Sequence, residues 1–298
     1  MDPKRLKVLK AFRRLAPRHR YNVWRLVGLT VSMGILLLVP LSGLARLDLW
    51  RGNHLVLFER APFNLTLAVV IGIFSLIYAA TFLINLVAGR MFCGWGCPIG
   101  QLHRLTENPA TPGLTRVQLR VRRLQAAMFA LLLPASVLAW WLDWRILFSG
   151  SPAERLAVAA ALFSGTGLAL AHGRWWSWRF CRQACPIGLY YSFVAPARWF
   201  GITFQRPDTC IECNLCDHVC PVDLLPRSLP EPIPSRGGLS IADAPGRNHC
   251  LECGDCVRAC EWIVRQKTGG IAPLELGFHR PPAQRKESNE FATYSTGA

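Results

Sequence analysis

The chain has 298 residues and a formal net charge of +16, yet 51% of its residues are hydrophobic and only 17% are charged. Soluble domains carry about 25% charged residues, so this composition excludes an ordinary soluble basic protein and indicates apolar segments between basic loops, as in a membrane protein. Twelve cysteines in a chain of this length also exclude a small secreted scaffold held by disulfides.

Four stretches carry no charged residue and are long enough to cross a bilayer, which takes about 17–25 residues. They are Leu26–Ala45, Ala61–Gly89, Leu124–Leu142 and Leu156–Gly173. The fourth is rich in Ala and Gly, so a buried or surface helix is its alternative interpretation. We therefore predict four transmembrane helices.

Basic residues predict how these helices are oriented. Twenty Lys and Arg lie in three segments, up to Arg25, at 90–123 and at 174–206, whereas the two remaining loops hold five. Positive charge accumulates on the cytoplasmic side, so we expect both termini to lie in the cytoplasm of a bacterial cell with the helices in its inner membrane. Because the basic segments adjoin the apolar stretches, we expect no nucleic-acid partner.

A short motif occurs twice. Arg90-Met-Phe-Cys-Gly-Trp-Gly-Cys-Pro-Ile-Gly recurs as Arg179-Phe-Cys-Arg-Gln-Ala-Cys-Pro-Ile-Gly, each time after a pair of apolar stretches. This predicts two repeated helical hairpins with both cysteine pairs at the cytoplasmic surface. Four thiols are the donor set of zinc, of an iron–sulfur cluster or of two redox-active thiol pairs; packing residues are the remaining alternative. The residues are Cys93, Cys97, Cys181 and Cys185.

The remaining eight cysteines follow in a polar, Pro-rich segment. Two runs with the spacing Cys-x-x-Cys-x-x-Cys-x-x-x-Cys begin at Cys210 and Cys250, which is the ligand pattern of bacterial ferredoxins. Three closely spaced thiolates bind one cluster, and the fourth reaches the other cluster. We therefore predict one [4Fe–4S] cluster on Cys210, Cys213, Cys216 and Cys260, and a second on Cys250, Cys253, Cys256 and Cys220. Glu261 places a negative charge next to one cluster, and paired zinc ribbons fit this spacing less well.

These features predict a four-part chain. We expect a basic cytoplasmic tail at 1–25, a four-helix membrane domain at 26–200, a cytoplasmic α+β ferredoxin-like domain with two [4Fe–4S] clusters at 201–275, and a polar tail at 276–298. A Pro- and Gly-rich surface insertion is expected at Pro226–Gly246.

The combination of four helices, a Cys-x-x-x-Cys-Pro motif after the second and fourth, and two ferredoxin runs resembles the membrane ferredoxin-type proteins of the NapH and MauN type. For NapH-type proteins the resemblance implies electron transfer from quinol toward periplasmic nitrate reduction, and for MauN-type proteins a role in methylamine utilisation. The CcoG and NosR types share the cysteine motifs and usually add further domains. The Cys-Gly-Trp-Gly-Cys-Pro-Ile-Gly-Gln-Leu segment is the more similar to the MauN type.

Two functions are compatible with these motifs. The first is an electron-transfer component, with no catalytic residues of its own, that connects the quinone pool or a cytoplasmic donor to redox partner proteins. If quinol is a substrate, a proton acceptor is needed near a helix end, and the candidates are Asp48, His54, Glu59 and His172. The alternative is a maturation factor or metal reductase that handles copper through the Cys-x-x-x-Cys-Pro pairs.

Overall fold

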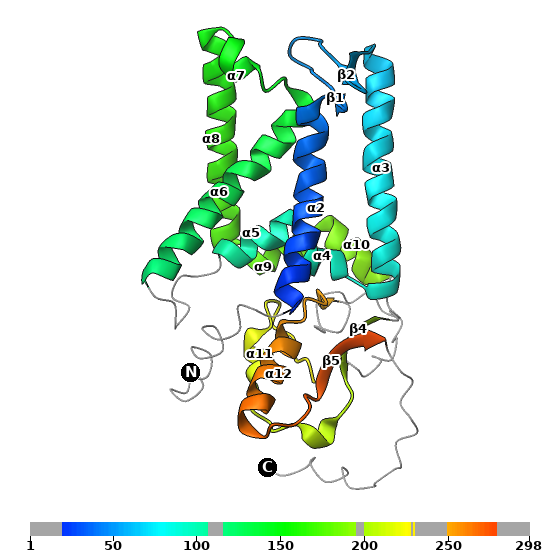
Figure 1. The fold of residues 1–298 in the computed structure, drawn as a ribbon, viewed down its shortest axis with the longest axis vertical. Helices are drawn as coiled ribbons and strands as arrows, with labels where there is room; N and C mark the ends of the chain where they lie inside the picture. The colour runs from blue at the N-terminus through cyan, green and yellow to red at the C-terminus, as the bar shows by residue number, and fades with distance from the viewer. Residues whose placement is uncertain (1–19, 107–115, 195–199, 228, 230–248, 279–298) are drawn as a thin grey trace.

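The computed structural model describes residues 20–106, 116–194, 200–227, 229 and 249–278. Within these ranges the chain forms four long helices that stand on a small domain of helices and strands (Figure 1). Most of the basic tail predicted at 1–25, of the insertion predicted at 226–246 and of the polar tail predicted at 276–298 lies outside the described residues.

The four long helices are, by length and composition, able to cross a membrane. They are α2 (Arg20–Ser42), α3 (Phe63–Ala88), α6 (Arg116–Trp141) and α8 (Pro152–Trp175). Pro40 and Pro134 lie inside α2 and α6 without ending these helices, because the backbone of a membrane helix has few partners outside itself.

Three of the long helices, α2, α6 and α8, begin before the predicted apolar stretches, and α3 begins within its stretch. Helix α6 begins eight residues before Leu124, because its arginine-rich first turns continue the helix beyond the apolar stretch. Helix α8 begins where Ser151 and Glu154 form a capping box: the Ser151 hydroxyl accepts the Glu154 amide, and the Glu154 carboxylate accepts the Ser151 amide.

The small residues of α8 make it a packing partner of its neighbours. A Cβ at Gly165 would lie 2.7 Å from the Cβ of Pro134, so glycine allows α6 and α8 to approach closely. A Cβ at Gly173 would lie 2.5 Å from the hydroxyl oxygen of Thr106, so glycine allows a close approach there too. Helix α6 also contacts α2, where the Trp140 indole donates to the Leu36 carbonyl at 2.9 Å.

Short elements fill both ends of the helix bundle. Between the long helices and the small domain lie α4 (Met91–Trp95), α5 (Pro98–Thr106), α9 (Ser177–Arg179), the π-helical turn η1 (Phe180–Ala184) and α10 (Pro186–Val194). The opposite end carries α7 (Ile146–Ser149) and an antiparallel sheet of β1 (Ala45–Arg46), β2 (Leu55–Val56) and β3 (Glu59–Arg60), which the sequence did not predict. Both sets are visible in Figure 1.

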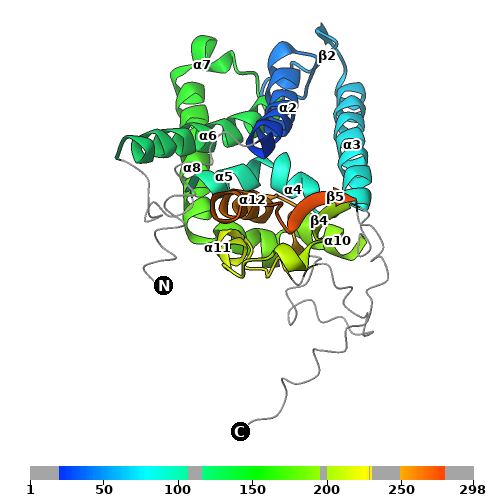
Figure 2. The same cartoon turned by 60° about the horizontal axis from the view of Figure 1, so that its bottom comes forward.

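The small domain is built on two helices and two strands. Strand β4 (Phe200–Phe204) pairs antiparallel with β5 (Leu274–Phe278), and between them lie η2 (Pro207–Thr209), α11 (Leu215–Val219) and α12 (Asp255–Lys267). Figure 2 shows α12 next to α4 and α5 of the membrane part, with α11 on the other side of α12. Tyr21 and Trp178 of the membrane part share one buried core with Leu251 and Val257 of the small domain, so the two parts form a continuous packed interface.

Candidate functional site

The eight ferredoxin-pattern cysteines line two separate small cavities. Cavity A is lined by Cys210, Cys213, Cys216 and Cys260, and cavity B by Cys220, Cys250, Cys253 and Cys256. Each of the two packed helices supplies both cavities: α12 carries Cys256 and Cys260 one turn apart, and Cys216 in α11 is followed at the helix end by Cys220. The structure thus brings together the same two groups of four that the sequence predicts.

The loops that enter the two cavities share one backbone conformation. Glu212 and Asn214 in the first loop have positive φ values of 48° and 54°, and Glu252 and Gly254, at the corresponding positions of the second, have 48° and 71°. Non-glycine residues seldom adopt this region. Alternation of right- and left-handed residues turns successive backbone N–H groups toward one side, an arrangement typical of phosphate and iron–sulfur sites.

The chemistry of the cavities fits a metal cluster. Burial raises the pKa of Cys220 and of Cys260 to about 11 each, and it raises the pKa of Cys253 and Cys256 above the ordinary thiol value. A thiolate is the form that ligates metal, so these thiols need positive charge inside the cavity to lose their protons. Four thiols around an apolar cavity provide the donor set of a [4Fe–4S] cluster.

The other four cysteines form a group at the membrane edge of the bundle, here called the thiol site: Cys93, Cys97, Cys181 and Cys185. The pKa of Cys93 is raised to about 12, mainly by burial and further by Cys97 and Cys185. The pKa of Cys181 is raised to about 12 by burial, then by Cys97, Cys93 and Cys185. The four thiols are therefore electrostatic neighbours, although they come from segments nearly 90 residues apart.

The two Cys-Pro-Ile-Gly segments have matching local structure. Cys97 precedes α5 and Cys185 precedes α10, and both helices start with proline, whose missing N–H is no loss in the first turn. The Gly188 amide lies 3.4 Å from the Cys185 sulfur, and the Gly100 amide bonds the Cys97 sulfur. A Cβ at Gly100 would lie 2.7 Å from the Cys93 carbonyl, so glycine allows the two cysteine-bearing turns to meet.

Two further residues complete the thiol site, and the sequence interpretation missed both. Arg90 is 1% exposed, donates to the Cys181 carbonyl, and has two guanidinium nitrogens without a hydrogen-bond partner in the described part of the chain. His103 is fully buried, with Nδ1 3.4 Å from the Cys181 sulfur and Nε2 3.2 Å from Nδ1 of His172. Arg90 lies shortly before Cys93 and His103 shortly after Cys97 in the sequence, and this closeness to the first Cys-x-x-x-Cys-Pro motif was the signal that could have indicated both residues.

The proton-acceptor candidates lie in two places. Burial, with His172 as a smaller cause, lowers the pKa of His103 to about 3, so the imidazole that joins Cys181 to His172 is neutral. Asp48, His54 and Glu59 lie at the opposite end of the bundle, in or beside the β1–β3 sheet (Figure 1). Asp48 there accepts two backbone amides of its own loop, which is a structural role.

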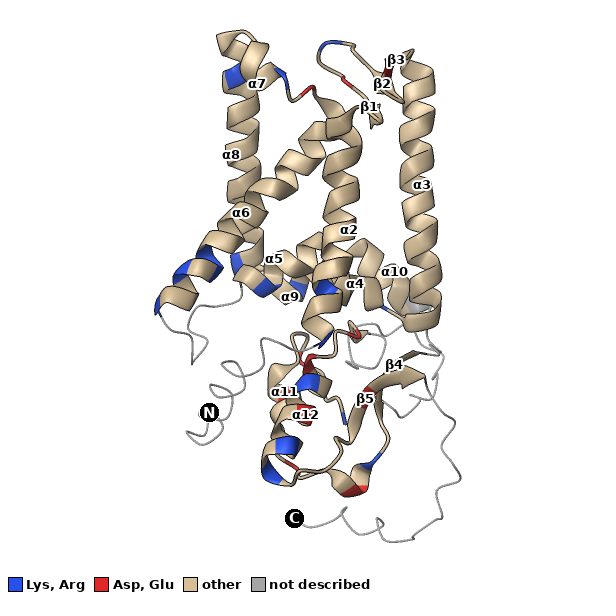
Figure 3. Cartoon of the chain, in the orientation of Figure 1, with Lys and Arg blue, Asp and Glu red and all other residues tan. Residues whose placement is uncertain are grey.

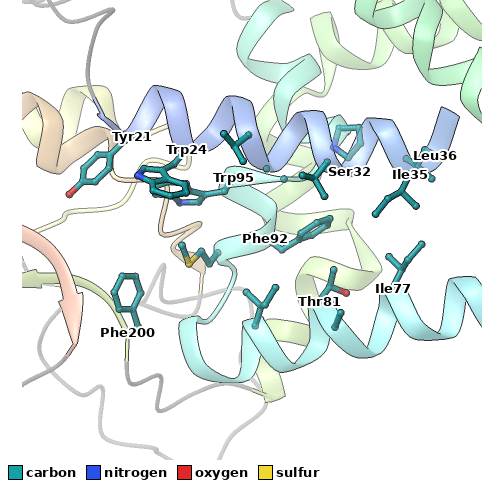
Figure 4. Close-up of a pocket in the computed structure, with 18 of the residues that line it drawn as sticks. Tyr21, Trp24, Ser32, Ile35, Leu36, Ile77, Thr81, Phe92, Trp95 and Phe200 are labelled. Carbon is teal, nitrogen blue, oxygen red and sulfur yellow. The ribbon is translucent and has the colours of Figure 1, made fainter. Parts of the chain in front are cut away.

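A large apolar pocket lies between α2, α3 and α4 (Figure 4). Its walls include Ile77 and Phe92, and its few polar side chains include Ser32 and Thr81. One end reaches Tyr21 and Trp95, whose rings pack edge to face at 5.7 Å. The Trp95 indole donates to the backbone carbonyl of Glu252 at 2.8 Å, which connects this end of the pocket to the loop of cavity B.

In the part of the chain that the structure describes, no three His, Cys, Asp or Glu side chains converge closely enough to hold one metal ion. All twelve cysteines, which lie within the described ranges, are free of disulfides.

Comparison with known proteins finds similarity to iron–sulfur proteins. A 4Fe-4S binding domain family, Fer4_5, matches residues 64–110, which include Cys93 and Cys97 of the thiol site. No solved structure matches the chain.

Several curated proteins are similar. An uncharacterized protein of Methanocaldococcus jannaschii is 25% identical over 180 residues, which are 59% of this chain and 63% of that protein. The ferredoxin-type protein NapH of Escherichia coli is 27% identical over 252 residues, 80% of this chain and 79% of NapH. The methylamine utilization ferredoxin-type protein MauN of Methylobacillus flagellatus is 24% identical over 151 residues, 46% of this chain and 50% of MauN. Together with the four apolar helices and the cysteine-lined cavities, these matches show that the chain is similar to the ferredoxin-type proteins NapH and MauN.

Proposed function

We propose that the protein carries one [4Fe–4S] cluster in cavity A and one in cavity B and passes electrons between the membrane quinone pool or a cytoplasmic donor and a redox partner protein. The observation that carries this proposal is the pair of four-cysteine cavities that share α11 and α12. A bound cluster supplies one-electron redox chemistry at a potential that its surroundings set. The shared helices keep the two sites adjacent, as electron exchange requires.

Iron content and EPR test this assignment. Protein purified without oxygen should hold about eight irons if both cavities are filled. Cys260→Ala should abolish the same EPR signal as Cys216→Ala, because both residues line cavity A, and Cys220→Ala should match Cys256→Ala. If Cys260→Ala instead abolished the signal lost in Cys256→Ala, the exchange of fourth ligands between the two runs would be wrong.

We propose a bacterial inner-membrane location with both termini and the ferredoxin domain in the cytoplasm. Figure 3 supports this orientation, since Lys and Arg concentrate at the ends of α2 and α6 that face the small domain. Alkaline phosphatase, which is active only in the periplasm, should be active when fused after Gly52 and inactive when fused after Ala298. The reverse result would refute the orientation.

The apolar pocket supports quinol as the membrane-side electron donor. Its walls suit an isoprenoid tail, and its Tyr21–Trp95 end lies against the loop of cavity B. A quinol releases two electrons and two protons, so both clusters would be needed to accept the electrons of one molecule. Of the four proton-acceptor candidates, His172 is the one on the small-domain side of the bundle, where its Nδ1 lies 3.2 Å from Nε2 of His103.

A bulky substitution inside the pocket tests this assignment. Ala80→Trp places an indole among the pocket-lining residues, whereas Leu76 on the same helix is 72% exposed and does not line it. A menaquinol analogue mixed anaerobically with cluster-loaded protein should reduce the wild type and the control Leu76→Trp, and Ala80→Trp should lose most of this reduction. Absence of cluster reduction in the wild type would refute direct quinol oxidation.

A second candidate function concerns the thiol site. The 4Fe-4S family match covers Cys93 and Cys97, and the unpartnered nitrogens of buried Arg90 favour an anionic occupant among the four thiols. A third cluster there would raise the iron content to about twelve per chain and return it to about eight in Cys93→Ala and Cys181→Ala. If iron stays near eight in all three proteins and copper is retained only by the wild type, the site handles copper for the maturation of a periplasmic enzyme.

The pathway is proposed from the relatives. MauN is named for methylamine utilization, which is the first proposed pathway. The match to NapH extends over 80% of this chain, and periplasmic nitrate reduction, which the resemblance to NapH-type proteins implies, is the alternative pathway. A deletion strain tested for growth on methylamine and on nitrate, with rescue by the wild type and by Cys220→Ala, separates the two. Rescue by Cys220→Ala would show that cavity B is not needed.

A further inference from the structure

One buried carboxylate beside cavity B attracts three arginines. Asp255, which is 5% exposed, accepts Nη2 of Arg25 at 2.8 Å and Nη1 of Arg104 at 2.6 Å, and Nη2 of Arg258 lies 3.6 Å away. The three side chains belong to three elements: α2 of the membrane part, α5 at the membrane edge, and α12 itself. We call these four residues the arginine node.

The arginine node lies directly beside a predicted cluster ligand. Oδ2 of Asp255 is 3.5 Å from the sulfur of Cys253, so Nη1 of Arg104 lies within about 6 Å of that sulfur. Arg25 additionally donates to the backbone carbonyl of Cys253. The guanidiniums of Arg104 and Arg25 oppose the effect of burial on the Cys253 thiol.

The charges around cavity B therefore do not cancel. Three guanidiniums face one carboxylate in the arginine node, and counting Glu252, which is 1% exposed, still leaves a net positive charge among the buried groups. The further carboxylate beside cavity B, that of Asp223 near Cys220, is exposed to solvent. These groups are largely buried, so water and salt screen them weakly.

Cavity A has a different environment. The sulfur of Cys216 lies 3.4 Å from the carboxylate of Asp217, whose arginine partner Arg227 is 33% exposed. Glu261 follows Cys260 and is paired with Arg20, a side chain that is 67% exposed. Carboxylates thus lie next to two ligands of cavity A, and their cationic partners reach into solvent.

Reduction adds one negative charge to a cluster, so a positive environment stabilises the reduced form. We propose that the arginine node raises the reduction potential of the cluster in cavity B above that of the cluster in cavity A. This proposal rests on the proposed function, because it needs a cluster in each cavity. The first electron that enters the protein then resides in cavity B, on the membrane side. Because Arg25 and Arg104 belong to the membrane part, this potential depends on the docking of the ferredoxin domain.

Redox titration of the purified full-length protein, followed by EPR, tests the proposal. Cys260→Ala and Cys220→Ala identify which signal belongs to which cavity. In Arg104→Gln the reduced-to-oxidised ratio of cluster B at a fixed potential should fall at least about tenfold, from the loss of one buried charge at this distance. The ratio of cluster A should not change, and Arg104→Lys should keep most of the wild-type ratio.

The matched control is Arg227→Gln, which should lower the ratio of cluster A only. If the Arg104→Gln protein loses iron, the Arg258→Gln protein is titrated instead, because Arg25 and Arg104 still hold the interface in that variant. The reduced-to-oxidised ratio of cluster B should fall in the same way. Equal shifts in both clusters, or no shift in loaded variants, would overturn the proposal. A wild type without two distinct EPR-active clusters would instead refute the proposed function.

Discussion

Gly94 offers a direct test of how the ferredoxin domain docks on the membrane part. It lies in α4 between Cys93 and Trp95, and an added Cβ would lie 3.1 Å from both Cα and Cβ of Cys253 and closer still to the Leu251 carbonyl oxygen. Backbone atoms cannot turn away as a flexible side chain can. Gly94→Ala must therefore push the loop of cavity B away from α4.

The magnitude follows from the cost of overpacking, which is about 1–3 kcal/mol. A value of about 1.4 kcal/mol corresponds to a tenfold change in an equilibrium constant, so the docked state should open about 5- to 140-fold more often. Hydrogen exchange measures this opening: backbone amides at 250–267 should exchange faster by the same factor in Gly94→Ala, while the cluster content stays near that of the wild type.

The control is Gly72→Ala, since a Cβ at Gly72 in α3 meets no atom within 4 Å. Exchange at 250–267 should be unchanged in this variant. If Gly94→Ala exchanged at the wild-type rate, the close approach of α4 to the cavity B loop would be wrong, and with it the route from the apolar pocket to cavity B.

Two further predictions concern the helix bundle and are read from thermal unfolding in detergent. Asp143→Asn removes the charged partner of Arg46; the two side chains are 3.0 Å apart and 13% and 4% exposed. Breaking a buried ion pair should lower the free energy of unfolding by about 3–5 kcal/mol, and a change within the error of the measurement would contradict this. Trp140→Phe removes the indole bond from α6 to the Leu36 carbonyl of α2 and should cost about 1–2 kcal/mol; an unfolding midpoint equal to that of the wild type would show that the bond is dispensable.

The sequence predicts well those features that depend on neighbours along the chain. Apolar stretches locate four helices, and cysteine spacing predicts the same two groups of cysteines that line cavities A and B in the structure. Boundaries are less accurate where a helix continues past its apolar stretch, as α6 does from Arg116. The glycines of α8 weaken its apolar character, although Gly165 is needed for packing against Pro134.

Contacts between distant residues escape this kind of prediction. Asp255 and Arg104 are 151 residues apart and Asp255 and Arg25 are 230 apart, so nothing local to either residue indicates their pairing. The contact of His103 with Cys181 escapes prediction for the same reason, because the two residues are 78 positions apart and only the tertiary fold brings them together. Local spacing predicts which cysteines lie together, whereas the charged groups around them come from the tertiary fold.

The difference between Asn214 and Gly254 has a consequence for assembly. Both residues occupy the same left-handed position in loops of nearly equal shape, so a ferredoxin domain with this internal symmetry presents two similar faces for docking. At Gly254 a Cβ would lie 2.9 Å from the ring of Tyr21, so only a loop that carries glycine there accepts this ring. One missing side chain thus favours docking through the loop of cavity B, so that cavity B and not cavity A lies next to the membrane part.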